Sequence, residues 1–187
     1  IAVDFSALGL SFMSVSAHKI GGPKGVGALV FDKSVRLEPL FKGGGQEKGL
    51  RGGTENVAGI VGFGVAAEIS QRNLGKNVKH LFLLRQRLEQ GLKKLPSVTI
   101  FSEQEKRLPN TLMFGVGGMD GEMLVMELDR KGIAVSSGSA CSGQDTEPSH
   151  VLLAMRVDRE VARSAIRVSL GSTSTETEVQ HFLAVLQ

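Results

Sequence analysis

Lys19 stands where its amine could do chemistry, at the end of an apolar run and at the start of a loop. Five of the eight residues that follow it, residues 20–27, are Gly or Pro. A lysine amine becomes a nucleophile when desolvation or a neighbouring cation lowers its pKa. Loops rich in Gly and Pro also commonly carry an ordinary solvated lysine. The loop by itself therefore leaves both uses open, with the turn lysine the more common of the two.

A second glycine-rich loop covers residues 43–54 and ends at Thr54, just before a helical pattern. Backbone N–H groups and a threonine hydroxyl at the start of a helix can bind an anion, typically a phosphate. The spacing of these glycines matches neither a P-loop nor a dinucleotide fingerprint. A tight loop that needs glycine for its dihedral angles explains the composition equally well.

Cys141 is the single cysteine of the chain and lies in the small-residue stretch SSGSAC, residues 136–141. A structural cysteine normally belongs to an apolar pattern, so this context predicts an exposed loop cysteine and favours reactivity over an inert thiol. With one cysteine and no closely spaced histidines, the chain is expected to form no internal disulfide and to bind no metal. A reducing compartment is the default for such a protein.

Arg167 interrupts the strand-like run IRVSLG, residues 166–171. An arginine at such a position can end in solvent. It can also project into a cleft and grip a carboxylate through two parallel hydrogen bonds. Like the lysine, the glycine loop and the cysteine, this arginine is only a moderate signal when taken alone.

The elements that must position these residues begin with two short strands, residues 10–16 and 26–31, which flank the lysine loop and predict a hairpin-like pair. Helices are expected over about 56–72, with Thr54 as N-cap, and over 76–95. The second helix carries an apolar stripe along one face. Its members are Val78, Leu81, Leu84, Leu88, Leu92 and Leu95.

Beyond Pro96 short strands alternate with helices. The strand patterns cover residues 98–101, 111–116, 133–136 and 165–170. One helix is expected to begin after an Asp120 cap and to end before Gly132, and another to hold Pro148 in its first turn. A last helix is expected after a capping box of Thr175 and Glu178.

The composition is ordinary for a globular protein, with 41% apolar residues, 22% charged residues and a net charge of +3. The charges are spread out and Tyr and Trp are absent, which argues against nucleic-acid binding. No apolar run approaches the roughly 20 residues that span a bilayer, and no secretory signal is visible. A domain boundary is expected near residues 73–77, which divides the chain into 1–75 and 76–187.

Together these segments resemble one known family. The stretches that carry the resemblance are SAHKIGGPKGVGAL (16–29), GGGQEKGLRGGT (43–54), SSGSAC (136–141), EPSHVL (147–152) and IRVSLG (166–171). In this order and spacing they are similar to the class V aminotransferases, and among them to the group I cysteine desulfurases of the nitrogenase and iron–sulfur-cluster type. The resemblance covers essentially the whole chain, as the C-terminal half of such an enzyme. It implies an α/β, fold-type I architecture, with part of the large cofactor-binding domain in 1–75 and the linking helix and an α+β small domain in 76–187.

The resemblance implies a site for pyridoxal 5′-phosphate, bound covalently to Lys19. Ser16 and His18 would bind the cofactor phosphate. Thr54 would reach the phosphate in the neighbouring subunit of a homodimer. The lysine would also shuttle protons at the α-carbon of the substrate, L-cysteine.

The resemblance further implies that Arg167 holds the carboxylate of L-cysteine. Cys141 would attack the substrate sulfur, leaving a persulfide on itself and releasing L-alanine. The sulfur would then pass to an iron–sulfur scaffold or another acceptor protein, in the cytoplasm or, as the alternative, in an organelle matrix.

One departure from the family concerns its N-terminal half, whose residues stack on and hold the cofactor ring and have no counterpart here. The isolated chain is therefore expected to bind the cofactor poorly and to be incomplete for activity unless a complementary polypeptide is present. Two other functions stay open at this point. One is a selenocysteine lyase, and the other is a non-catalytic module that binds a sulfur acceptor or scaffold.

Overall fold

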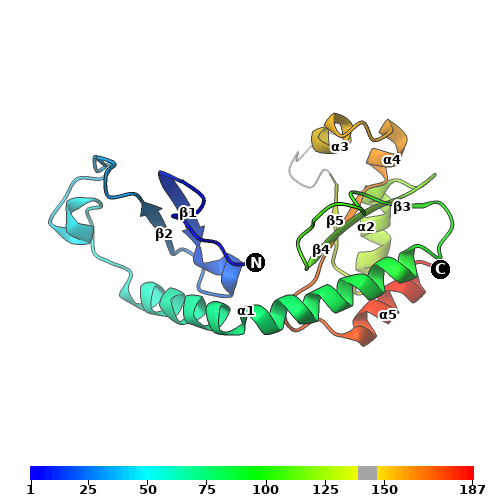
Figure 1. Ribbon diagram of the computed structural model, residues 1–187, viewed down its shortest axis with the longest axis horizontal. Coiled ribbons are helices and arrows are strands. Elements are labelled where there is room, and N and C mark those ends of the chain that lie inside the picture. Colours follow the sequence, from blue (N-terminus) through cyan, green and yellow to red (C-terminus); the bar gives the residue numbers. More distant parts are fainter. Residues whose placement is uncertain (139–146) are drawn as a thin grey trace. The chain divides into compact units, whose positions relative to one another are not determined.

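The computed structural model describes residues 1–138 and 147–187, and it divides the chain into two compact units, residues 1–75 and 76–187. Figure 1 shows the elements of each unit. Strands and helices occur in both, which confirms the predicted α/β class. Within the described ranges no helix is long and apolar enough to cross a membrane.

The first unit is built on an antiparallel pair of strands, β1 (Phe12–Ser16) and β2 (Gly27–Phe31). The pairing register places Phe12 opposite Phe31 at one end and Ser16 opposite Gly27 at the other, which confirms the predicted pair. A short 3₁₀ helix, η1 (Ala17–Ile20), follows β1 directly. A second one, η2 (Gln46–Gly49), lies in the glycine-rich loop.

A single helix, α1 (Val57–Leu92), replaces the two helices that the sequence predicts. Gly75 does not end it, because a glycine costs a helix interior only about 1 kcal/mol and, unlike proline, keeps its N–H donor. The predicted N-cap at Thr54 is also wrong. Asn56 caps the helix instead, since its Oδ1 accepts the backbone N–H of Gly59 at 3.1 Å.

The second unit holds a four-stranded antiparallel sheet with the order β3-β4-β6-β5. Its strands are β3 (Val98–Ile100), β4 (Thr111–Val116), β5 (Ser136–Ser137) and β6 (Ile166–Ser169). The strand predicted over 133–136 is therefore displaced, because only Ser136 and Ser137 find partners on β6. The apolar run predicts that the side chains of Ile133 and Val135 are buried. Whether these residues pair in the sheet depends instead on where the neighbouring strand β6 ends.

Besides α1, four helices accompany this sheet in the described part of the second unit: α2 (Gly121–Arg130), α3 (His150–Ala154), α4 (Arg159–Arg163) and α5 (Glu176–Val185). Asp120 caps α2, and Gly132 follows it in the left-handed region at φ 75°, as predicted. The capping box of Thr175 and Glu178 is also confirmed. Pro148, however, precedes α3 rather than lying in its first turn, and α4 is too short to give a periodic signal.

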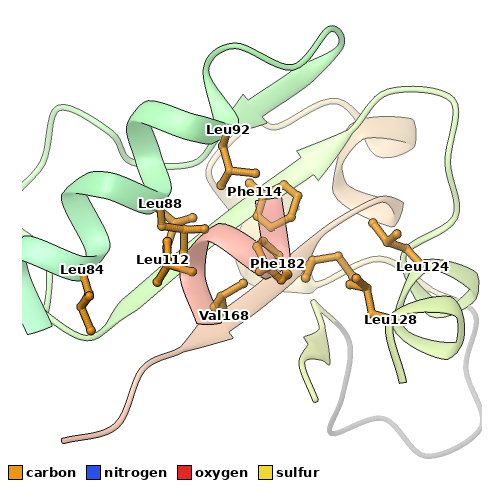
Figure 2. Close-up of a cluster of buried hydrophobic side chains, with 11 residues drawn as sticks. Leu84, Leu88, Leu92, Leu112, Phe114, Leu124, Leu128, Val168 and Phe182 are labelled. Carbon is orange, nitrogen blue, oxygen red and sulfur yellow. The ribbon is translucent and has the colours of Figure 1, made fainter. Parts of the chain in front are cut away.

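The hydrophobic core of the second unit forms where α1, α2 and α5 cover the sheet (Figure 2). Leu84, Leu88 and Leu92 supply the α1 side, which confirms that part of the predicted stripe. Phe114 of β4 meets Phe182 of α5 edge to face, with ring centroids 6.3 Å apart. Aromatic pairs in this geometry add about 1 kcal/mol beyond the area they bury. This core includes side chains of β6 and holds that strand in place within the second unit.

Candidate functional site

The lysine loop presents three polar side chains on one tight turn. β1 ends at Ser16, whose backbone is still extended, and η1 then carries His18 and Lys19. All three residues are exposed, whereas Ala17 between them is fully buried. Gly21 ends the turn at φ 81°, a left-handed conformation that costs glycine little. The hydroxyl, the imidazole and the amine therefore leave the backbone within four consecutive residues.

The lysine loop packs closely against α1 because glycine and alanine occupy the contact positions. The backbone N–H of Gly22 donates to the carbonyl of Ala17 at 2.9 Å. A Cβ at Gly22 would lie 3.2 Å from the Cβ of Ala66, and a Cβ at Gly62 would lie 2.7 Å from Cγ of Pro23. The glycines are thus needed for close packing, and they fix the turn that carries Lys19.

The glycine-rich loop folds back on itself. The N–H of Gly52 donates to the carbonyl of Phe41 at 2.9 Å, and a Cβ at Gly52 would lie 2.8 Å from the backbone of Gly43. The guanidinium of Arg51 lies 5.2 Å from the centre of the Phe41 ring, a cation–π contact. Thr54 lies at the end of this loop and is exposed. Contrary to the prediction from the sequence, it does not cap α1, because Asn56 does.

Arg167 lies in the middle of β6, between Met113 of β4 and Ser136 of β5. Ile166 and Val168 on either side of it are buried in the core, so strand alternation turns Arg167 to the exposed face. Its Nη2 lies 3.5 Å from Oγ of Ser136. The sequence suggested that this arginine breaks the strand pattern. The structure shows instead that Arg167 is an exposed member of a half-buried strand.

Gly138 anchors the chain just before the segment 139–146. Its N–H donates to the carbonyl of Ala165 at 2.7 Å, and a Cβ there would lie 2.7 Å from the Cβ of Ala165. Cys141, predicted as the reactive thiol, lies outside the described residues. The sequence pattern indicates only that Gly138 belongs to a small-residue loop, although a glycine next to a strand is a recognised sign of close backbone approach.

The predicted site residues thus fall into groups that the structure positions separately. Ser16, His18 and Lys19 share one turn of the first unit, and Thr54 lies in its glycine-rich loop. Arg167 lies beside Ser136 in the second unit, a neighbour that sequence reasoning did not single out. No cluster of three metal-ligating side chains occurs among the residues that the structure describes.

The donors on the lysine turn suit the chemistry of pyridoxal phosphate. In the described part of the chain, neither His18 nor Lys19 takes part in an ion pair, and Ser16 makes no capping hydrogen bond. A hydroxyl and an imidazole can bind a phosphate, and a lysine amine can bond covalently to an aldehyde. The residues present therefore fit this group.

Comparison with known protein families decides the affiliation. A model of the family described as aminotransferase class-V matches residues 1–182. The chain belongs to the class-V aminotransferase family. Its predicted fold-type I architecture is confirmed by the fold of related class-V structures.

Several known proteins match this chain over 95% to 100% of its length. The X-ray structure of a NifS-like protein from Rickettsia africae is 39% identical, with a TM-score of 0.87 over 100% of this chain and 49% of its own. The cysteine desulfurase IscS of Clostridium botulinum (strain Hall) is 41% identical over 100% of this chain and 48% of its own. A cysteine desulfurase of Cereibacter sphaeroides is 48% identical over 95% of this chain and 45% of its own. The chain therefore spans about half the length of the class-V relatives it matches.

Proposed function

We propose that this chain is the C-terminal half of a pyridoxal-phosphate-dependent cysteine desulfurase. The observation that carries the proposal is the turn on which Ser16, His18 and Lys19 present three exposed donors within four residues. Relatives named cysteine desulfurase are 41% and 48% identical to the chain, which supports the same activity. Residues 1–75 then form the C-terminal part of the large cofactor-binding domain, and 76–187 the linking helix and the small domain.

In this proposal Lys19 holds the cofactor covalently, while Ser16 and His18 hold its phosphate. Thr54 reaches the phosphate of the neighbouring subunit in a homodimer. When bound, the cofactor supplies an electron sink for the substrate carbons. The part of Lys19 is to move a proton at the substrate α-carbon, and the tight packing of its turn on α1 keeps the amine in place.

Arg167 binds the carboxylate of L-cysteine. The exposed face of β6 leaves its guanidinium open to a substrate, and Ser136 beside it offers a hydroxyl that steadies the side chain. Planar, bidentate pairing with a carboxylate gives orientation as well as affinity. The substrate is thereby gripped at one end while its sulfur stays accessible.

Cys141 accepts the sulfur. Its thiolate attacks the substrate sulfur, the S–S bond of a persulfide forms, and the carbon–sulfur bond of the substrate breaks, with its electron pair staying on carbon. Protonation of that carbon yields L-alanine. The persulfide is then delivered to an iron–sulfur scaffold or another acceptor protein in a reducing compartment, which we take to be the cytoplasm.

The activity is tested on the completed protein, meaning this chain combined with a polypeptide for the other half of the family fold. Reduction with borohydride in the presence of pyridoxal phosphate, followed by peptide mapping, should label Lys19. L-cysteine should then yield L-alanine and a persulfide on Cys141, and Cys141→Ser should abolish both. A labelled complex that produces no alanine would contradict the desulfurase assignment. Faster turnover of L-selenocysteine, unaffected by Cys141→Ser, would assign a selenocysteine lyase instead.

A further inference from the structure

Two arginines of the second unit are buried with only one carboxylate between them. Arg85, on α1, is 7% exposed, and the side chain of Arg107, in the segment before β4, is 15% exposed. Oε1 of Glu89 lies 2.8 Å from Nη2 of Arg107 and 3.7 Å from Nε of Arg85. The neighbouring Glu103 pairs with Lys93, so that pair adds no net charge. Arg85, Glu89 and Arg107, which we call the arginine cluster, therefore carry one uncompensated positive charge.

The hydrogen-bond donors of the arginine cluster also outnumber their acceptors. Arg85 donates from Nη1 to the carbonyl of Leu108 at 2.9 Å, and Arg107 donates from Nη2 to the carbonyl of Glu103 at 3.1 Å. Among the residues that the structure describes, nothing accepts from the buried Nε of Arg85 or from the buried Nε and Nη1 of Arg107. The buried Oε1 of Glu89 likewise makes no aligned hydrogen bond. Three donor nitrogens and one acceptor oxygen are thus left over.

Buried groups in this condition destabilise a fold. A buried donor without a partner loses its hydration and gains nothing in return, and the loss is greater when the group is charged. One water molecule has two lone pairs, so it cannot accept from all three nitrogens, and it leaves the net charge unchanged. A small anion meets both requirements, because it accepts from several N–H groups at once and cancels one positive charge.

We propose that the arginine cluster binds a small monovalent anion of the halide class, such as chloride, through the free N–H groups of Arg85 and Arg107. A phosphate suits the cluster less well, because its charge exceeds the single positive charge that is left over, and burying the excess is unfavourable. The bound ion ties α1 to the segment before β4 and so stabilises the second unit. This inference does not depend on the proposed desulfurase activity.

Bromide is the probe, because its anomalous X-ray scattering distinguishes it from water. Chemical denaturation of the chain is followed by circular dichroism while bromide rises from about 10 to about 300 mM, with fluoride holding the ionic strength constant. Fluoride serves as the inert ion because a smaller ion costs more to remove from water. The folding equilibrium constant should rise about five- to tenfold, as a site with a Kd of about 20–50 mM requires. Crystals soaked in bromide should show an anomalous peak at the guanidinium groups of Arg85 and Arg107.

Two substitutions should change the bromide dependence in opposite directions. Arg107→Gln should abolish it, because the change removes the surplus charge and two of the free donor nitrogens. Glu89→Gln, whatever its own effect on stability, should tighten bromide binding at least tenfold, because it leaves two uncompensated charges. Arg130→Gln is the control and should keep the parent dependence, since Arg130 pairs with Glu127 on the surface and its side chain is 67% exposed.

The bromide peak and the denaturation series give independent readings, so a variant that fails to fold leaves the inference open to refutation. The inference is wrong if the stability of the parent chain does not depend on bromide, or if the soaked crystals show density without an anomalous signal at the arginine cluster. A dependence that persists unchanged in a folded Arg107→Gln chain would place the bromide elsewhere and overturn it as well.

Discussion

Glu89 of α1 faces Arg107, which precedes β4 in the chain, with 2.8 Å between the carboxylate Oε1 and Nη2 of the guanidinium. Arg85, one turn before Glu89, lies 3.7 Å away through Nε and donates from Nη1 to the carbonyl of Leu108. All three side chains are at most 15% exposed. One carboxylate thus neutralises part of two buried positive charges and ties α1 to the segment before β4.

Replacing Glu89 by Gln should destabilise the second unit by about 3 kcal/mol, because it leaves two buried guanidinium groups uncompensated. Chemical denaturation of the chain measures this as a lower midpoint. Glu68→Gln is the control: Glu68 pairs with Arg72 across the same kind of helical spacing, but both side chains are more than 60% exposed. That change should cost less than about 0.5 kcal/mol. Equal effects of the two substitutions would show that burial of the cluster does not govern its contribution.

Gly91 marks a close crossing of α1 and α5. A Cβ at Gly91 would lie 2.2 Å from Cδ1 and 3.0 Å from Cγ of Leu183, so rotation of the leucine tip alone does not clear it. Gly91→Ala should therefore destabilise the second unit by about 1–3 kcal/mol, despite the better helix propensity of alanine. Adding Leu183→Ala should recover part of the loss, a non-additivity that a double-mutant cycle detects. Strict additivity would contradict the contact.

Gly62 and Gly64 give opposite predictions although they lie two residues apart on α1. Gly62→Ala should displace the loop that carries Lys19, because the new Cβ would meet Pro23 at 2.7 Å. In the completed protein we expect labelling of Lys19 by pyridoxal phosphate and borohydride to slow at least tenfold. Gly64→Ala should leave labelling unchanged and stabilise α1 by about 0.5–1 kcal/mol, since nothing lies within 4 Å of that Cβ. Unchanged labelling in Gly62→Ala would refute a positioning role for this contact.

Ser34 lowers the pKa of Asp32 below its ordinary value of 3.8, through a hydrogen bond from its hydroxyl and another from its backbone N–H. Because the folded pKa is the lower one, the carboxylate stabilises the fold above its ordinary pKa, and this contribution is lost as the pH falls through the folded value. Ser34→Ala removes the hydroxyl and should raise the pKa of Asp32, as measured by NMR titration. Ser34→Thr keeps a hydroxyl and should preserve most of the lowering. A pKa that is unchanged in Ser34→Ala would contradict this cause.

Arg167→Lys should raise KM for L-cysteine in the completed protein by roughly 10- to 100-fold, because lysine cannot pair with a carboxylate through two parallel hydrogen bonds. The fold should survive, since Arg167 is on the exposed face of β6. Arg130→Lys serves as the control, because Arg130 pairs with Glu127 on the surface of α2. A loss of kcat with unchanged KM would assign Arg167 another role.

Local features of the chain could be predicted because a few neighbouring residues determine them. The Thr175–Glu178 capping box, the Asp120 cap and the left-handed Gly132 depend on hydrogen bonds and dihedral angles within one helical turn. The pairing of β1 with β2 follows from a short loop between two apolar runs. The ordered motifs around Lys19, Thr54, Cys141 and Arg167 also indicate the family. The residue types that a reaction requires are visible in the sequence itself.

Tertiary structure decided what depends on residues distant in the chain. Whether Gly75 interrupts α1, and whether 133–135 pairs with β6, depends on packing and on where neighbouring elements end. The buried Arg85–Glu89–Arg107 cluster joins charges that any sequence pattern assigns to the surface. The sequence itself determined which groups can perform chemistry. Only the fold decided which faces are covered, because burial is a property of surfaces that meet in space. On α1 of the first unit it left Val57, Val61, Val65 and Ile69 exposed.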